Sequence, residues 1–161
     1  MRIHPVDYRS AQDATDLRVL LDLYARDPMG GGDALDADVL GRLCGDLAGR
    51  ADAFSFLAYA DAPQRQAIGL INCFEGYSTF KARPLLNIHD IVVHPDYRGA
   101  GVGQALLGAA HDLALSRGCC KLTLEVLSGN AAAMRSYAHF GFANYQLDPA
   151  AGQAVLMQKW L

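Results

Sequence analysis

The stretch HPDYRGAGVGQALL, from His94 to Leu107, places three glycines directly after an arginine and in front of a helical pattern. Glycine allows positive φ values and lets the backbone approach a ligand closely. A helix N-terminus presents unpaired N–H donors and about half a positive charge, so phosphate binds there readily. Arg98 adds a planar, permanently charged partner. The stretch therefore predicts an anion site, most simply a phosphate site.

Two well-known phosphate loops differ from this stretch. A P-loop ends in Gly-Lys-Ser/Thr, whereas Gly103 is followed by Gln104 and Ala105. A dinucleotide fingerprint reads G-x-G-x-x-G, whereas this stretch reads G-A-G-V-G, with one residue too few before the last glycine. The glycines alone leave open which phosphate compound binds, or whether they form only a glycine-rich turn.

Around this stretch, hydrophobic periodicity predicts a mixed order of strands and helices. Three consecutive strands indicate a meander, and a later strand–helix–strand unit implies a parallel pair, so the fold class is mixed α/β (α+β). The segment DAPQ, Asp61–Gln64, is typical of a hairpin turn. The expected strands are Ile3–Tyr8, Ala53–Tyr59, Ala67–Phe74, Leu85–Val93, Lys121–Leu127, Phe142–Leu147 and Ala154–Trp160. Four helices are expected. The first begins after Ser10 and ends before Pro28, and the second carries an apolar stripe from Leu35 to Leu47. The third follows Gly103, and the fourth runs from Asn130 to Phe140.

Length and composition favour a single domain over residues 1–161, since the chain is 52% hydrophobic and 19% charged. The net charge of −3 gives no electrostatic case for a nucleic-acid partner. No apolar segment approaches the roughly 20 residues of a membrane span, and the first residues lack the apolar core of a signal peptide. We expect a cytoplasmic protein without a membrane partner.

The four cysteines, Cys44, Cys73, Cys119 and Cys120, show no C-x-x-C pairing and no metal-ligand spacing. The five histidines form no H-x-x-x-H or H-x-x-E-H pattern. Free cysteine is among the most often buried residue types, so reduced and mostly buried thiols are the interpretation. We predict no metal site.

Two sequence blocks together resemble a known superfamily. The first is V-x-P-x-Y-R-G-x-G-V-G at Val93–Gly103, and the second is N-x-x-A-x-x-x-Y-x-x-x-G-F at Asn130–Phe142. In this order and spacing they are similar to the motifs of the GCN5-related N-acetyltransferases (GNAT). The resemblance implies a central, mostly antiparallel mixed sheet of about seven strands flanked by four helices. A splayed parallel strand pair in that fold holds acetyl-coenzyme A.

The resemblance also implies how the chain holds acetyl-coenzyme A (acetyl-CoA). The pantetheine arm would lie along the strand end Ile91–Val93, and the glycine stretch would bind the pyrophosphate. Asn130 would bind the arm or position water, or it only caps the following helix. The implied cofactor-binding residues are Ile91, Val92, Val93, Arg98, Gly99, Ala100, Gly101, Val102, Gly103, Gln104, Asn130 and Tyr137.

Acetyl transfer to an amine needs an oxyanion donor, an acid for the leaving thiolate and a base for the ammonium proton. A backbone N–H near Val93 can stabilise the oxyanion. Tyr137 matches the family tyrosine that protonates the thiolate, and an ordinary tyrosine pKa of about 10 suits that role. A core tyrosine without a catalytic role is the alternative for Tyr137.

The base is less clear, because the segment Gly76–Gly99 resembles polyamine and diamine acetyltransferases, which have a glutamate at this strand position. Here His89 stands at the matching position, followed by Asp90. Neutral histidine can accept a proton near pH 7. Strand alternation puts the two side chains on opposite faces unless a bulge intervenes. We expect His89 as the base rather than Asp90, and a water chain without a single base is a third possibility.

The loops that form the acceptor site in this superfamily carry four candidate residues here. Asp33 and Glu75 could counter a cationic amine, and Tyr77 and Phe80 could wall its aliphatic part, although carboxylates on loops are usually solvated. We expect an acetyl-CoA-dependent N-acetyltransferase, an acyltransferase acting on a small primary amine such as a polyamine, a diamine or an amino acid. Attack would be direct, in a ternary complex, and the protein would be a homodimer, as is common in the superfamily. The alternatives are a protein lysine or N-terminal amine acetyltransferase and a non-catalytic coenzyme A-binding module.

Overall fold

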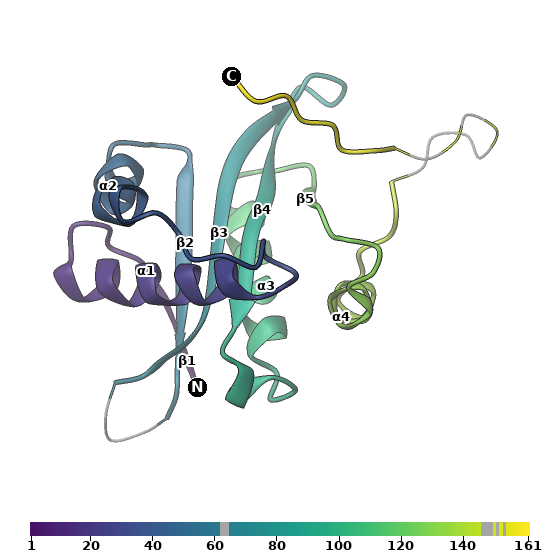
Figure 1. Cartoon of the computed structure of the whole chain (residues 1–161). Coiled ribbons are helices and arrows are strands. Elements are labelled where there is room, and N and C mark those ends of the chain that lie inside the picture. The colour runs from purple at the N-terminus through teal and green to yellow at the C-terminus, as the bar shows by residue number, and fades with distance from the viewer. Residues whose placement is uncertain (62–64, 146–149, 151, 153) are drawn as a thin grey trace. The chain divides into compact units, whose positions relative to one another are not determined.

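The computed structural model describes residues 1–61, 65–145, 150, 152 and 154–161, which contain ten helices and strands (Figure 1). They divide into two compact units, Met1–Leu124 and Glu125–Leu161. The elements of the first unit are β1 (Arg2–Pro5), α1 (Ala11–Arg26), α2 (Ala37–Ala48), β2 (Ala53–Tyr59), β3 (Ala67–Ser78), β4 (Arg83–Val93), the 3₁₀ helix η1 (Pro95–Tyr97), α3 (Val102–Ser116) and β5 (Leu122–Leu124). The second unit contains α4 (Ala131–Phe140). None of the helices in the described part of the chain is long and apolar enough to cross a bilayer.

The first unit is a five-stranded sheet in the order β1-β2-β3-β4-β5. Neighbouring strands are antiparallel except β4 and β5, which are parallel. Helices α1 and α2 lie on one side of the sheet and α3 lies on the other (Figure 1). The mixed α/β class, the mostly antiparallel sheet and the parallel strand pair are confirmed; its two strands precede and follow the glycine stretch in the sequence.

Local chemistry explains where the first two helices begin and end. The Ser10 side chain accepts a hydrogen bond from the N–H of Asp13 at 3.4 Å, which caps α1 as expected. Helix α1 ends at Arg26, ahead of Pro28. Asp36 caps α2, so Leu35 lies outside the helix stripe expected from the sequence. Its N–H donates to Asp22 instead, at 2.8 Å.

The main apolar core lies between α1, α2 and the sheet, and it is built from alternate residues of the central strands. Leu17 of α1, Leu57 of β2 and Leu70 of β3 are fully buried in it. On the opposite face, Leu106 and Leu107 of α3 are equally buried. The two layers hold β4 between them, which positions the strand end that leads into the glycine stretch.

Gly69 on β3 allows α3 to pack close to the sheet. A Cβ atom there would lie 2.9 Å from Val102 Cγ1, 3.0 Å from Leu106 Cδ1 and 3.1 Å from the carbonyl oxygen of Val92. Val102 is the first residue of α3 and belongs to the glycine stretch. Gly69 therefore sets the distance between the sheet and the helix N-terminus.

We expect Gly69→Ala to lower the free energy of unfolding by about 1–3 kcal/mol, because an added methyl group overpacks this contact. Chemical denaturation measures the loss. The matched control is Gly108→Ala within α3, where a Cβ atom would meet nothing within 4 Å and alanine favours the helix. A Gly69→Ala protein as stable as the wild type would contradict the packing argument.

Four expected strands differ clearly in the structure. The first ends at Pro5 rather than Tyr8, and the fifth covers only Leu122–Leu124 of the expected Lys121–Leu127. In the second unit, residues 142–145 and 154–160 form no strand, so five strands rather than about seven are found in the described residues. Apolar composition suggested a strand at 154–160, but a strand also needs a neighbour for its N–H and C=O groups. Residues 146–147 and the turn residues 62–64 lie outside the described part.

Candidate functional site

The glycine stretch has the backbone geometry that an anion site requires. Gly99 and Gly101 have φ values of +80° and +81°, which favour glycine, and a Cβ atom at either position would meet nothing within 4 Å. Gly101 begins α3 without a side-chain cap. Within the described residues, no hydrogen-bond acceptor is found for the N–H groups of Val102 and Gly103. Donors at an uncapped helix N-terminus suit a phosphate group.

Arg98 connects the glycine stretch with the end of α1. Its Nε donates to the carbonyl oxygen of Val93 at 3.3 Å, and its Nη2 donates to Asp27 Oδ2 at 3.0 Å. Asp27 also accepts from the N–H of Met29 at 2.9 Å. The Met29 hydrogen bond, followed by the Arg98 hydrogen bond, lowers the pKa of Asp27 below its usual range. Asp27 therefore stays ionised and would compete with a phosphate for Arg98.

The end of β4 has an open edge within the first unit. β4 pairs with β5 only from Leu86 to Ile88, although it continues to Val93. The N–H of His94 donates to Ile68 of β3 at 2.8 Å. Because alternate residues of a strand direct their N–H and C=O groups to opposite sides, Ile91 and Val93 direct theirs away from β3. Within the first unit, β4 thus extends past its pairing with β5 and leaves this edge unpaired.

A β-bulge interrupts β4 at His89. Asn72 pairs with Asp90 and Cys73 pairs with Ile88, so His89 has no partner residue on β3. Asn72 Nδ2 donates to Asp90 Oδ2 at 3.0 Å. The ring of His89 contacts the ring of Phe74 edge-on, with centroids 5.5 Å apart.

The bulge changes which face the two candidate bases share. Asn72 and Phe74 are two residues apart on β3 and lie on the face covered by α1. Asp90 contacts the first and His89 contacts the second, so both side chains lie on that face. Simple alternation would separate them, but the extra residue of a bulge changes the alternation, which is the exception that the sequence left open.

Tyr24 of α1 interacts electrostatically with the Asp90 carboxylate. Burial is the main cause that raises its pKa, and the negative charges of Asp90 and Asp27 raise it further. Tyr24 therefore lies within electrostatic reach of both carboxylates. In the sequence, Tyr24 belongs to the apolar stripe of α1, so its place near these carboxylates is not apparent. The only sequence signal is its place in the last turn before the loop that contains Gly30.

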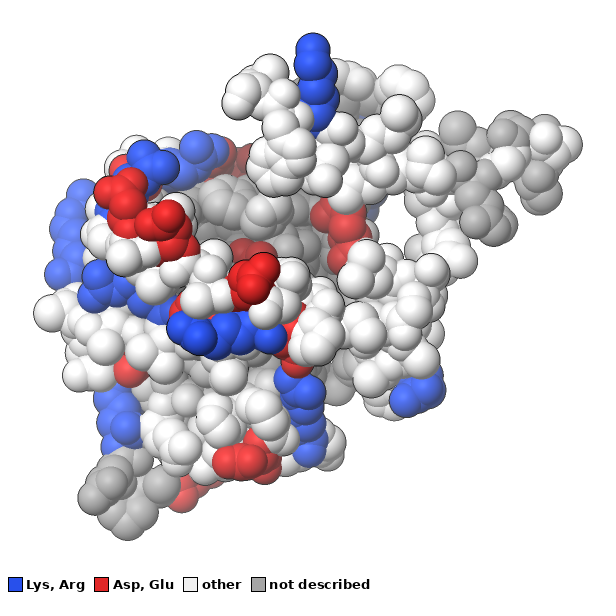
Figure 2. Space-filling view, viewed as in Figure 1, with Lys and Arg blue, Asp and Glu red and all other residues white. Residues whose placement is uncertain are grey.

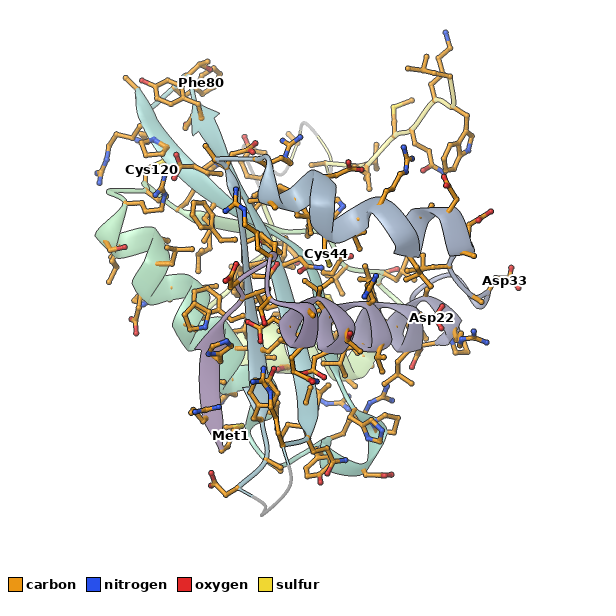
Figure 3. The ribbon with its side chains drawn as sticks, turned by 90° about the vertical axis from the view of Figure 1, so that its left-hand side faces the viewer. Met1, Asp22, Asp33, Cys44, Phe80 and Cys120 are labelled. Carbon is orange, nitrogen blue, oxygen red and sulfur yellow. The ribbon has the colours of Figure 1, made fainter. Side chains whose placement is uncertain are left out.

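The structure does not bring the four expected acceptor residues together. Asp33 and Phe80 lie far apart in the first unit (Figure 3). Tyr77 and Phe80 are 62% and 93% exposed at the tip of the β3–β4 hairpin. Glu75 forms an ion pair with Arg117, which follows the last residue of α3. Its carboxylate thus lies near the end of α3 farthest from the glycine stretch.

The second unit carries the downstream motif on α4. Asn130 Oδ1 accepts from the N–H of Ala133 at 3.1 Å, so Asn130 caps this helix. Gly141 ends the helix with a φ of 107°. Tyr137 lies on α4, and its ring centroid is 6.0 Å from that of Phe142. The helix expected from Asn130 to Phe140 is confirmed.

Charged groups of both signs are interspersed on the face shown in Figure 2. Across residues 1–61, 65–145 and the described positions beyond them, no group of three or more His, Cys, Asp or Glu is placed to hold a metal ion. At the bulge, Asp90 and His89 place a carboxylate and an imidazole beside main-chain donors.

The chain is similar to known acetyltransferases over part of its length. Streptothricin acetyltransferase of Streptomyces lavendulae is 44% identical over 79 residues, which cover 49% of this chain and 41% of that protein. Thialysine N-epsilon-acetyltransferase of Bos taurus is 42% identical over 65 residues, which cover 40% of this chain and 38% of that protein. The chain thus matches less than half the length of these two relatives.

Solved structures share the fold over nearly the whole chain. A probable acetyltransferase superposes with a TM-score of 0.83 at 18% identity, covering 99% of both chains. The aminoglycoside N-acetyltransferase AAC(6')-Iy, in complex with CoA, superposes with a TM-score of 0.76 at 17% identity, covering 98% of this chain and 93% of that one. Residues 17–142, which include the bulge, the glycine stretch and α4, match the profile of the Acetyltransferase (GNAT) family. The protein has the GNAT fold and belongs to the acetyltransferase (GNAT) family.

Proposed function

We propose that the chain is an acetyl-CoA-dependent N-acetyltransferase that acts on a primary amine of a small molecule. The observation that carries this proposal is the open edge of β4. This edge begins at the bulge, where Asp90 lies, and the strand is followed in the sequence by the uncapped helix N-terminus at Gly101. A carboxylate at one end and an anion site at the other suit a cationic amine and a phosphate-bearing donor. The named relatives, a streptothricin and a thialysine acetyltransferase, support a small-molecule acceptor.

The first unit contains groups that fit acetyl-CoA, which supplies the thioester. The N–H groups of Val102 and Gly103, with the guanidinium of Arg98, suit the pyrophosphate. The outward main-chain groups of Ile91 and Val93 can pair with the amide groups of the pantetheine arm, as an added strand would. The same Val93 N–H is the candidate donor to the oxyanion.

We expect Asp27→Asn to tighten acetyl-CoA binding about two- to fivefold, because Arg98 loses a competing anion in an exposed ion pair. Isothermal titration calorimetry at low and high salt measures the change, and the gain should shrink as salt screens the charges. Asp38→Asn, which breaks the exposed Asp38–Arg42 pair of α2, is the matched control and should leave the affinity unchanged. Weaker binding by Asp27→Asn would show that Asp27 supports the loop more than it competes with phosphate.

For the base we propose Asp90, with His89 as the alternative that the sequence favours. Asp90 Oδ2 accepts from Asn72, and Oδ1 has no hydrogen-bond partner in the described residues. Because no buried side-chain oxygen of those residues lacks a partner, Oδ1 is open to solvent. The His89 side chain is exposed and packs against Phe74. Oδ1 of Asp90 can therefore attract an ammonium group and receive its proton.

Direct attack by the amine is favoured over an acetyl-enzyme. Burial raises the pKa of Cys73, the cysteine opposite the bulge, to about 12, and burial also raises the pKa of Cys44 and Cys119. A thiol must ionise to become a nucleophile, so these three are poor ones. Tyr137 is the proposed acid that protonates the leaving thiolate, on the strength of its motif, and Asn130 can contribute to the arm while it caps α4.

The acceptor is proposed to be a small primary amine with an aliphatic body. Tyr24, Phe74 and the Asp90 carboxylate lie on the face of the sheet covered by α1, and aromatic rings beside a carboxylate suit an aliphatic ammonium. For the rest of the acceptor, binding by Asp33, Glu75, Tyr77 and Phe80 stays a prediction.

Mass spectrometry of products from an amine panel tests the proposal. The panel contains polyamines, diamines, amino acids, aminoglycosides and a lysine peptide, each with acetyl-CoA. We expect acetylation of at least one small primary amine. Acetylation of the peptide alone would favour the protein acetyltransferase alternative. Binding of acetyl-CoA without any acetylated product would favour a coenzyme A-binding module.

A homodimer is proposed as the assembly, and residues 155–161 offer a surface for it. Val155, Leu156, Met157 and Trp160 are 76–85% exposed in the second unit. A contiguous exposed apolar segment favours a protein contact. Sedimentation velocity measures the state, and a monomer at micromolar concentration would contradict the proposal.

A further inference from the structure

A chain of side-chain hydrogen bonds crosses the sheet and ends on Asp90. The hydroxyl of Tyr8 lies 2.8 Å from Ser55 Oγ, and Ser55 Oγ donates to Asn72 Oδ1 at 2.6 Å. Asn72 Nδ2 then donates to Asp90 Oδ2 at 3.0 Å. Ser55, Asn72 and Asp90 belong to the adjacent strands β2, β3 and β4. This hydrogen-bond chain therefore links Tyr8, in the segment between β1 and α1, with the bulge.

The donors in this chain all point toward Asp90. Ser55 has one hydroxyl proton, which it donates to Asn72, so it accepts from the hydroxyl of Tyr8. Burial is the main cause that raises the pKa of Tyr8, which keeps that proton in place at neutral pH. Turning the Asn72 amide over would set its oxygen against the Asp90 carboxylate and lose that bond, although Ser55 could accept from the turned amide. The network thus favours one orientation of Asn72, and bonds aligned in this way strengthen one another.

The position of this network argues for a role beyond packing. Ser55 and Asn72 are each only 5% exposed and adjoin the apolar core built around Leu57 and Leu70. Apolar side chains of similar size would fill such positions without the cost of burying polar groups. What the polar groups accomplish is to occupy one oxygen of Asp90 and leave the other open at the bulge.

We propose that Asn72 is a positioning residue for acetyl transfer, that it holds the Asp90 carboxylate with Oδ1 toward the amine, and that Ser55 and Tyr8 hold Asn72. The inference rests on the proposed function, in which Asp90 Oδ1 receives the amine proton. A neutral carboxamide neither gains nor gives up a proton readily near neutral pH, so the network orients Asp90 and does not conduct protons.

A double-mutant cycle between Asn72 and Asp90 tests this proposal. Asn72→Ala should lower kcat about tenfold or more, as loss of a hydrogen bond to a charged group does, while KM for acetyl-CoA changes less than about twofold. In the Asp90→Asn background, Asn72→Ala should have no further effect on kcat, because residues that act through one another are not additive. An equal loss of kcat in both backgrounds, or no loss in either, would overturn the proposal.

Asn87→Ala is the matched control for this cycle. Asn87 also lies on β4, three residues from Asp90, and its Nδ2 donates to Thr123 Oγ1 at 3.1 Å. Its replacement also removes an amide from the sheet but not from the Tyr8–Asp90 chain, so kcat should stay within about twofold of wild type, the margin set for independent sites. If Asn72→Ala does not fold, Ser55→Ala provides the same cycle, with a smaller loss expected because Asn72 keeps its bond to Asp90.

Proton exchange of the Asn72 side-chain amide, followed by NMR, gives a second readout that needs no activity. We expect slow exchange in the wild type and at least tenfold faster exchange in both Ser55→Ala and Asp90→Ala. Exchange in the wild type as fast as that of a solvated amide would overturn the positioning role. If the amine panel yields no product, the proposed function fails, and slow Asn72 exchange would show that the failure lies there and not in the hydrogen-bond chain.

Discussion

Asp90→Asn is expected to lower kcat about 100- to 10,000-fold, the range for loss of a general base, while acetyl-CoA binds as before. An asparagine keeps the size of the side chain but has no carboxylate oxygen to receive the proton at the position of Oδ1. Its Oδ atom can still accept from Asn72, so the fold of the bulge should persist. Steady-state kinetics with a saturating amine measure kcat, and calorimetry measures the affinity for acetyl-CoA.

His89→Ala is the control for this substitution. The His89 ring packs on Phe74, so its loss should reduce kcat less than tenfold through changed packing alone. A large loss in His89→Ala with little loss in Asp90→Asn would assign the base to the histidine. Small losses in both would favour the water chain without a single base.

Tyr137→Phe is expected to lower kcat about 100-fold, because the leaving thiolate then has no positioned acid. The affinity for acetyl-CoA should change little, since the substitution removes one hydroxyl and keeps the ring that contacts Phe142. Pre-steady-state thiol release measures the chemical step directly. Tyr145→Phe removes a hydroxyl from a 60% exposed tyrosine of the same unit and should leave kcat unchanged. A strong loss of affinity in Tyr137→Phe would contradict the acid role.

Local patterns in the sequence predicted the parts of the site that depend on local backbone chemistry. Gly99 and Gly101 need positive φ values, and Ser10 and Asn130 cap helices, so their residue types carry the information. The break in β4 pairing beyond Ile88 follows from the family resemblance. These features could be placed without knowledge of which strands are neighbours.

The bulge at His89 could not be predicted from the residues in the same way. Its existence depends on the register between β3 and β4, where Asn72 faces Asp90 and Cys73 faces Ile88. Alternation in β4 alone separates His89 from Asp90, and only the pairing brings them to one face. Asn72 escaped notice for the same reason, because it lies inside an apolar strand pattern and its partner is 18 positions away.

Residues on loops and at the second unit's end were the least predictable. Asp33 and Phe80 were grouped because the superfamily builds its acceptor site from their loops, yet they lie far apart in the first unit (Figure 3). Glu75 is engaged by Arg117, a residue 42 positions away. In residues 154–160 the apolar pattern predicted a strand, but composition indicates only a need for burial and does not specify a pairing partner.

Release of free thiol from acetyl-CoA, measured with and without amine, tests the central claim most directly. Direct transfer in a ternary complex predicts that release requires both acetyl-CoA and a small primary amine, and that one acetylated amine forms for each thiol. Asp90→Asn should lower the rate of this release about 100-fold or more. A burst of one thiol per enzyme without amine would instead show an acetyl-enzyme. Bound acetyl-CoA with no amine-dependent release across the panel would contradict the claim altogether.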